Sequence, residues 1–262
     1  SGVLAQVYSQ SPVIHNELIN RDRPSATANS ARNKLLYAML NHESEKDLGI
    51  DKFPAEKAIY RSLLKATGLH KEGSDEKWQL AEPALDKRHL TAIEKTSNIS
   101  PIWGCINAFL DSTENQARSF AELNKKLMAP PYGVKAGVLP ILYIAAYAVY
   151  NYELALYENR RYKPFFTEEM LERFVKRPDQ FEFQRFRIDG MKASIFSQYS
   201  RVFHGDTKKR TLLEIARPLA ALMGSLPDYT KNTKRGISEQ AKEVRTVFNL
   251  AKSPQRLLLH DL

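Results

Sequence analysis

Clusters of lysine and arginine are the residues of this sequence that most clearly point to a function, namely the binding of phosphate groups. Arg160, Arg161 and Lys163 fall at the turn and second strand of an expected β-ribbon, and such ribbons commonly reach a phosphate backbone or a minor groove. Basic side chains that neutralise phosphates release counterions, which drives non-specific binding. The residues predicted to contact nucleic acid are Arg160, Arg161, Lys163, Lys125, Lys126, Lys135, Lys208, Lys209, Arg210, Lys231, Lys234 and Arg235.

The positive charge is concentrated in the second half of the chain. The 262 residues carry 39 Lys and Arg against 30 Asp and Glu, a formal net charge of +9. Residues 131–262 hold 22 of the basic and 14 of the acidic side chains, whereas residues 1–130 hold 17 and 16. This surplus fits contacts with phosphates. The alternative is that Lys and Arg only cover solvent-exposed faces, since the net charge is moderate.

No complete catalytic or cofactor signature occurs in the sequence. A Gly-x-x-x-x-Gly-Lys-Ser/Thr loop, a dinucleotide-binding glycine fingerprint and a His-Glu-x-x-His helix are all missing. We therefore expect no cofactor, no metal and no catalytic residue. The single cysteine, Cys105, excludes an internal disulfide, and its apolar neighbours predict a buried, inert thiol. An unrecognised nuclease would use the local set His204, Asp206 and Lys208.

Apolar spacing and breaker residues predict a mainly α-helical fold with a small antiparallel ribbon or sheet. No run of about 18 apolar residues exists, so the sequence predicts no membrane span. Phe181 to Ile188 alternates but changes phase, which predicts a strand with a bulge. Helices are expected near residues 28–43, 54–67, 90–95, 102–110, 120–128, 138–150, 167–177, 191–203, 211–226 and 239–252, and strands near 78–80, 154–157, 162–166 and 181–188.

Three consecutive helices followed by a ribbon predict a winged helix within residues 99–190, between helical regions 1–98 and 191–262. Its third helix, at 138–150, has no charged residue, so we expect it to be buried and unable to read base edges. Tyr143, Tyr147 and Tyr150 recur there at helical spacing; we expect core aromatics, with base stacking as the alternative. The wing is therefore expected to contact the backbone, or to be purely structural.

Several short strings give the sequence a family resemblance. Among them are Pro130-Pro131-Tyr132-Gly133 and Leu226-Pro227-Asp228-Tyr229-Thr230. The others are residues 11–12, 16–21, 48–50, 68–70, 137–140 and 155–158. Together they resemble large bacterial P-loop ATPases of anti-phage defence systems, of the BREX type and its relatives. The resemblance implies a non-catalytic region downstream of an ATPase core in a machine that acts on nucleic acid. Because the phosphate-binding loop is missing, no ATPase residue carries over.

These observations predict a non-catalytic, nucleic-acid-contacting and protein-docking region of a larger bacterial defence ATPase in the cytoplasm. The first residues, Ser1-Gly2, and the apolar end at 257–262 suggest an excised piece of a longer protein. The expected partners are DNA, contacted non-specifically through its backbone, and other subunits or the rest of a longer chain; no membrane is expected. Two alternatives stay open, a protein-interaction scaffold with no nucleic-acid role and an unrecognised nuclease.

Overall fold

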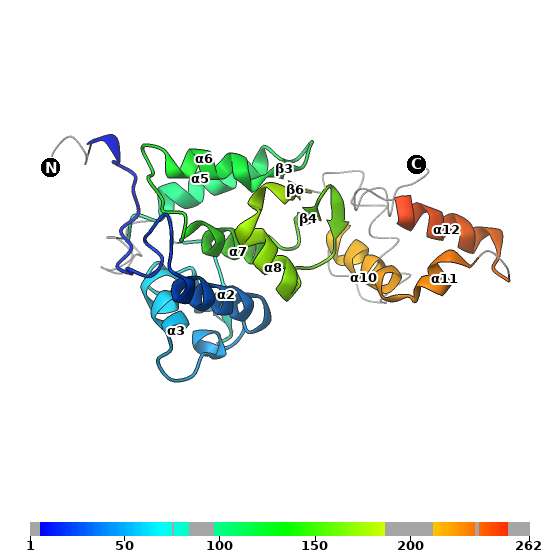
Figure 1. Ribbon diagram of the computed structural model, residues 1–262, viewed down its shortest axis with the longest axis horizontal. Coiled ribbons are helices and arrows are strands. Elements are labelled where there is room, and N and C mark those ends of the chain that lie inside the picture. Colours follow the sequence, from blue (N-terminus) through cyan, green and yellow to red (C-terminus); the bar gives the residue numbers. More distant parts are fainter. Residues whose placement is uncertain (1–5, 75, 84–96, 187–211, 234–235, 251–262) are drawn as a thin grey trace. The chain divides into compact units, whose positions relative to one another are not determined.

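The computed structural model is mainly α-helical with two small sheets, which confirms the expected fold class (Figure 1). It describes the chain except residues 1–5, 75, 84–96, 187–211, 234–235 and 251–262. The chain forms two compact units. The first comprises Ser1–Ser112, Ser119–Asn151 and Thr167–Asp179, and the second comprises Thr113–Arg118, Tyr152–Phe166 and Gln180–Leu262. Within the described residues, no helix has the length and apolar character needed to cross a membrane.

The N-terminal part of the first unit combines two helices with a short hairpin. Helix α2 spans Ala26–Asn41 and packs against α3, which spans Ala55–Tyr60. A 3₁₀ turn, η1 (Lys46–Gly49), precedes α3, and a π-helical turn, η2 (Arg61–Lys65), follows it. Strands β1 (His70–Glu72) and β2 (Trp78–Leu80) pair antiparallel, so the short strand expected at 78–80 is confirmed. The expected helix at 90–95 lies outside the described residues.

The rest of the first unit is built around a buried helix. Helices α5 (Ser100–Asp111), α6 (Phe120–Met128), α7 (Leu139–Val149) and α8 (Glu168–Lys176) follow the expected order. Every residue of α7 from Ile141 to Ala148 is buried, which confirms the expectation for this apolar segment. Tyr143 stacks on Phe120 with ring centroids 4.3 Å apart, and its hydroxyl donates to Asn124 Oδ1 at 2.6 Å. The tyrosines of this helix are therefore core aromatics.

Apart from Ser119, which belongs to the first unit, the second unit contains a four-stranded sheet in the order β3-β6-β4-β5; Figure 1 labels β3, β6 and β4. Its strands are β3 (Arg118–Ser119), β4 (Leu154–Glu158), β5 (Arg161–Lys163) and β6 (Phe181–Arg185). The expected ribbon is present as the β4–β5 hairpin, but β4 also pairs along its other edge with β6, so the ribbon is not a free two-stranded wing. The ladder between β4 and β6 is regular, so the expected bulge is wrong for the described strand.

Helices α10 (Leu212–Ser225), α11 (Asp228–Asn232) and α12 (Glu239–Leu250) complete the described part of the second unit. The helix expected at 191–203 lies outside the described residues. The three helices of the predicted winged helix belong to the first unit and its ribbon to the second. The winged helix and the ranges 1–98, 99–190 and 191–262 therefore stay predictions.

Candidate nucleic-acid interface

The turn of the β4–β5 hairpin presents two consecutive arginines, and we call Asn159, Arg160 and Arg161 the hairpin tip. All three residues are exposed. Asn159 and Arg160 have φ angles of 51° and 62°, as the two central residues of a type I′ turn require. Asn tolerates this left-handed conformation, whereas for Arg160 it costs on the order of 1 kcal/mol. The Asn159 N–H donates to Gln180 O at 2.8 Å, which ties the turn to the start of β6.

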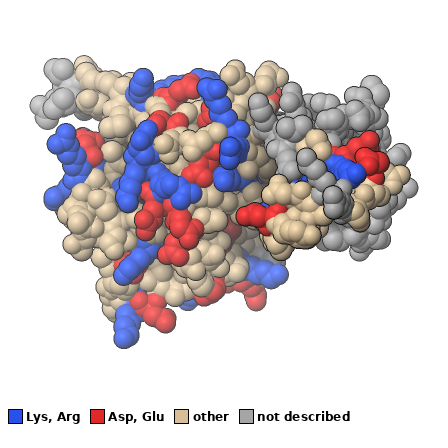
Figure 2. Space-filling view, turned by 45° about the vertical axis from the view of Figure 1, so that its right-hand side comes forward, with Lys and Arg blue, Asp and Glu red and all other residues tan. Residues whose placement is uncertain are grey.

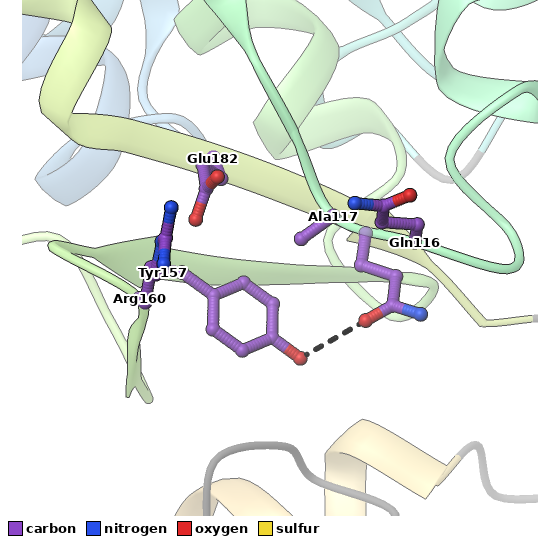
Figure 3. Close-up of a pocket in the computed structure, with 6 residues that line it drawn as sticks. Gln116, Ala117, Tyr157, Arg160 and Glu182 are labelled. Atoms are coloured by element: carbon purple, nitrogen blue, oxygen red, sulfur yellow. Dashed lines mark hydrogen bonds between the residues drawn. The ribbon is translucent and has the colours of Figure 1, made fainter.

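A pocket of about 430 Å³ lies beside the hairpin tip, within the second unit. We call it the Tyr157 pocket; its lining residues are Gln116, Ala117, Tyr157, Arg160, Glu182 and Gln184. Arg160 and Glu182 lie to one side of the Tyr157 ring, and Gln116 and Ala117 to the other (Figure 3). Arg160 therefore belongs both to the tip and to the pocket.

The register of the sheet places these side chains together. Tyr157 of β4 pairs with Glu182 of β6 on one side and with Tyr162 of β5 on the other. Directly paired residues share a face, and so does every second residue along a strand, which brings Gln184 to the same face. Leu156 and its partner Phe183 point to the opposite face, where both are buried. One face of the sheet thus contributes to the core and the other to a polar pocket.

Two hydrogen bonds fix the amide of Gln184. The Tyr157 hydroxyl donates to Gln184 Oε1 at 3.2 Å, the bond drawn as a dashed line in Figure 3. Gln184 Nε2 donates to Glu114 O at 3.2 Å. A glutamine amide has two N–H donors and two acceptor lone pairs, so one of each remains for a ligand. The side chain of Gln116, by contrast, is exposed and has no hydrogen-bond partner among the described residues.

The pocket combines a phenol with one cation and one carboxylate. Burial raises the pKa of the Tyr157 phenol, and the nearby Tyr162 and Glu182 raise it further. The phenol therefore stays protonated at neutral pH and acts as a hydrogen-bond donor. Arg160 supplies one cation and has no ion-pair partner within the described part of the chain. Glu182 supplies one carboxylate.

Several other predicted contact residues are engaged within their own unit. Lys163 Nζ lies 3.6 Å from Glu158 Oε2, and Lys135 Nζ lies 3.0 Å from Asp22 Oδ2. Lys231 Nζ donates to Gly224 O at 2.8 Å and lies 3.7 Å from an Asp228 carboxylate oxygen. These intramolecular contacts reduce the charge that the three lysines offer to a ligand.

The remaining residues predicted to contact nucleic acid lie in the first unit or outside the described residues. Lys125 and Lys126 are exposed in the last turn of α6, in the first unit, whereas the hairpin tip belongs to the second. Lys208, Lys209, Arg210, Lys234 and Arg235 lie outside the described residues. Figure 2 shows Lys and Arg side chains interspersed with Asp and Glu over the described residues of one face.

Among the residues that the structure describes, the other candidate side chains form no second site. Cys105 is buried, as expected. Within the described ranges, no group of three or more His, Cys, Asp and Glu is arranged to hold a metal ion. The nuclease set His204, Asp206 and Lys208 falls in the segment that the structure leaves undescribed.

Sequence reasoning missed five of the six pocket residues, namely Gln116, Ala117, Tyr157, Glu182 and Gln184. The alternation Phe181-Glu182-Phe183-Gln184 carried part of the signal, because it separates an apolar from a polar face. Comparison with protein-family models, curated proteins and solved structures gave no match. The resemblance to ATPases of anti-phage defence systems therefore stays a prediction.

Proposed function

We propose that this chain is a binding region that contacts the phosphate backbone of nucleic acid through the hairpin tip. The observation that carries the proposal is the pair Arg160 and Arg161, exposed on an ordered turn. Guanidinium groups present several N–H donors in a planar fork that matches phosphate oxygens. A turn whose backbone is already fixed loses little conformational entropy on binding.

We expect each predicted residue to contribute less to DNA binding when it already lies beside a carboxylate of the protein. Lys163 lies beside the Glu158 carboxylate, so it should contribute less than the two arginines. Arg160 and Arg161 lie outside the apolar core, and Arg160 has no competing carboxylate within ion-pair distance among the described residues. We therefore assign the main phosphate contacts to the tip.

The test is the salt dependence of binding. The chain is titrated into labelled 20-mer duplex and single-stranded DNA between 50 and 200 mM salt, and fluorescence anisotropy gives the dissociation constant. Each phosphate contact contributes about 0.9 to the logarithmic salt slope for duplex DNA and about 0.7 for single strands. The double variant Arg160→Ala/Arg161→Ala should therefore lower the slope by about 1.8 and 1.4, respectively.

A matched control separates the tip from the general charge. Arg23→Ala/Lys34→Ala removes two exposed positive charges from the first unit and should change the slope much less. Equal salt slopes for the tip variant and the wild-type protein would show that the hairpin tip does not contact phosphates.

A protein-docking role is the second candidate, and the mixed surface charge favours it. Lys135, Lys163 and Lys231 already lie beside carboxylates, as in a surface that carries charges of both signs. Two exposed arginines also fit an acidic protein surface. No binding of either DNA at 50 mM salt would favour this role and turn the search toward protein partners.

A further inference from the structure

We infer that the Tyr157 pocket accepts an unpaired base of a single-stranded nucleic acid whose adjacent phosphate contacts Arg160. This inference rests on the proposed function, because the hairpin tip must hold the backbone beside the pocket. It adds a ligand preference for single strands, which phosphate contacts alone do not provide.

The charges of the pocket suit the two parts of a nucleotide. Arg160 lies at the turn, where the tip meets the pocket, and can hold an anionic group there. Glu182 lines the same pocket and repels a second anion, while its oxygens can accept N–H groups. A ligand that fits both residues is anionic at the tip and carries neutral N–H donors inside, as a nucleotide does through its phosphate and base.

The amide groups suit the edge of a base. Gln184 retains one donor and one acceptor after its bonds with Tyr157 and Glu114, and these bonds hold the amide in one orientation. A glutamine amide can pair with a donor and an acceptor on a base at the same time. Gln116 adds a second amide that has no hydrogen bond among the described residues and can adapt to the ligand.

The shape of the site explains why the base must be unpaired. Bases in a duplex are stacked and paired, so a base can enter a lined pocket only after it leaves the helix, which costs free energy. In a single strand the edges of the bases are already exposed to protein side chains. We expect single-stranded DNA or RNA to bind at least about tenfold more tightly than a duplex of the same length.

Two variants test the pocket without removing the arginines. Ala117→Leu adds a branched side chain to the lining and should block entry of a base. Gln116→Ala removes the free amide and breaks none of the hydrogen bonds described above; it should weaken single-strand binding about threefold to tenfold. Neither variant should change the salt slope, since both keep Arg160 and Arg161. Circular dichroism and thermal melting of the two variants verify that each is folded.

The decisive ligand is a single strand that keeps its phosphates and lacks its bases. Anisotropy compares a 20-mer single strand of mixed sequence with a 20-mer of abasic deoxyribose phosphate. We expect the abasic strand to bind at least about tenfold more weakly than the strand of mixed sequence. Ala117→Leu should abolish that difference. If both strands bind equally well and the salt slope depends on Arg160 and Arg161, the pocket does not bind a base, whereas the proposed function is retained. A salt slope unaffected by the tip variant would overturn both.

Discussion

We expect the buried side chain of His70 to make the stability of the first unit dependent on pH. The side chain is 1% exposed, with Nε2 2.8 Å from Glu43 O and Nδ1 2.9 Å from the Tyr60 hydroxyl. A carbonyl oxygen only accepts, so Nε2 carries the proton and Nδ1 accepts from Tyr60. Burial lowers the pKa of His70 and outweighs the bond to Glu43 O, which raises it. The folded protein therefore holds the neutral imidazole.

The sign and the size of the effect follow from this difference between states. The unfolded chain takes up a proton near pH 6.5 and the folded chain does so only at lower pH, so stability falls as pH decreases through 6.5 toward the folded pKa. Between pH 7.5 and 5.5 an unfolded imidazole gains about 0.8 of a proton. The loss attributable to His70 is therefore at most about 1.4 kcal/mol.

Urea unfolding at the two pH values measures this loss. The two tryptophans, Trp78 and Trp103, both lie in the first unit, and the Trp78 ring centroid is 5.2 Å from that of His70, so tryptophan fluorescence reports the relevant unit. Burial raises the pKa of Glu43, which acts in the opposite direction on acidification. The change in wild-type stability must therefore be compared with that of His70→Gln, which cannot titrate.

The loss of unfolding free energy on acidification should differ between the wild-type protein and His70→Gln. His70→Gln should be less stable at both pH values but should lose less free energy between them than the wild-type protein does. His15→Gln, at an exposed position, serves as the control and should behave as the wild type. If wild type and His70→Gln lose the same free energy on acidification, the buried neutral histidine does not account for the pH dependence.

Three further predictions concern the stability of the first unit. Tyr60→Phe leaves the buried Nδ1 of His70 without its donor and should cost about 1–3 kcal/mol in urea unfolding; a change below about 0.5 kcal/mol would contradict the bond. A Cβ at Gly137 would collide with Ile19 O and lie 2.9 Å from Pro24 Cγ, so Gly137→Ala should destabilise by about 1–3 kcal/mol. Gly104 in α5 has nothing within 4 Å of an added Cβ, so Gly104→Ala should instead stabilise by about 0.5–1 kcal/mol, and both signs are read from thermal melting.

Local signals in the sequence were enough for most helices. Ser119 and Thr167 are residue types that favour the start of a helix, and each accepts a backbone N–H at the start of α6 and α8, respectively. The uncharged run 138–150 became the buried helix α7, since a segment without a polar face has to be enclosed. Asn159 takes the left-handed conformation that asparagine tolerates, because a tight hairpin turn requires positive φ.

Other features depend on contacts that no local pattern contains. The sequence predicted Lys135 as a nucleic-acid contact, but Asp22 lies 113 residues from Lys135 along the chain and only 3.0 Å away between charged atoms. The Leu48 backbone has a φ of 56°, unusual for a residue with a bulky side chain, and its side chain is buried. Burial of such a side chain compensates for local strain that the sequence alone does not reveal.

The sequence by itself determined most of the described helices, among them the buried α7, and the basic turn, because these depend on residues within a few positions of one another. Only the tertiary structure decided the Tyr157 pocket. Tyr157 meets Glu182 and Gln184 through the register of β4 and β6, and Gln184 reaches Glu114 across 70 residues. Strand register is set by the packing of the whole sheet, and a slip of one residue would turn the pocket side chains to the opposite face.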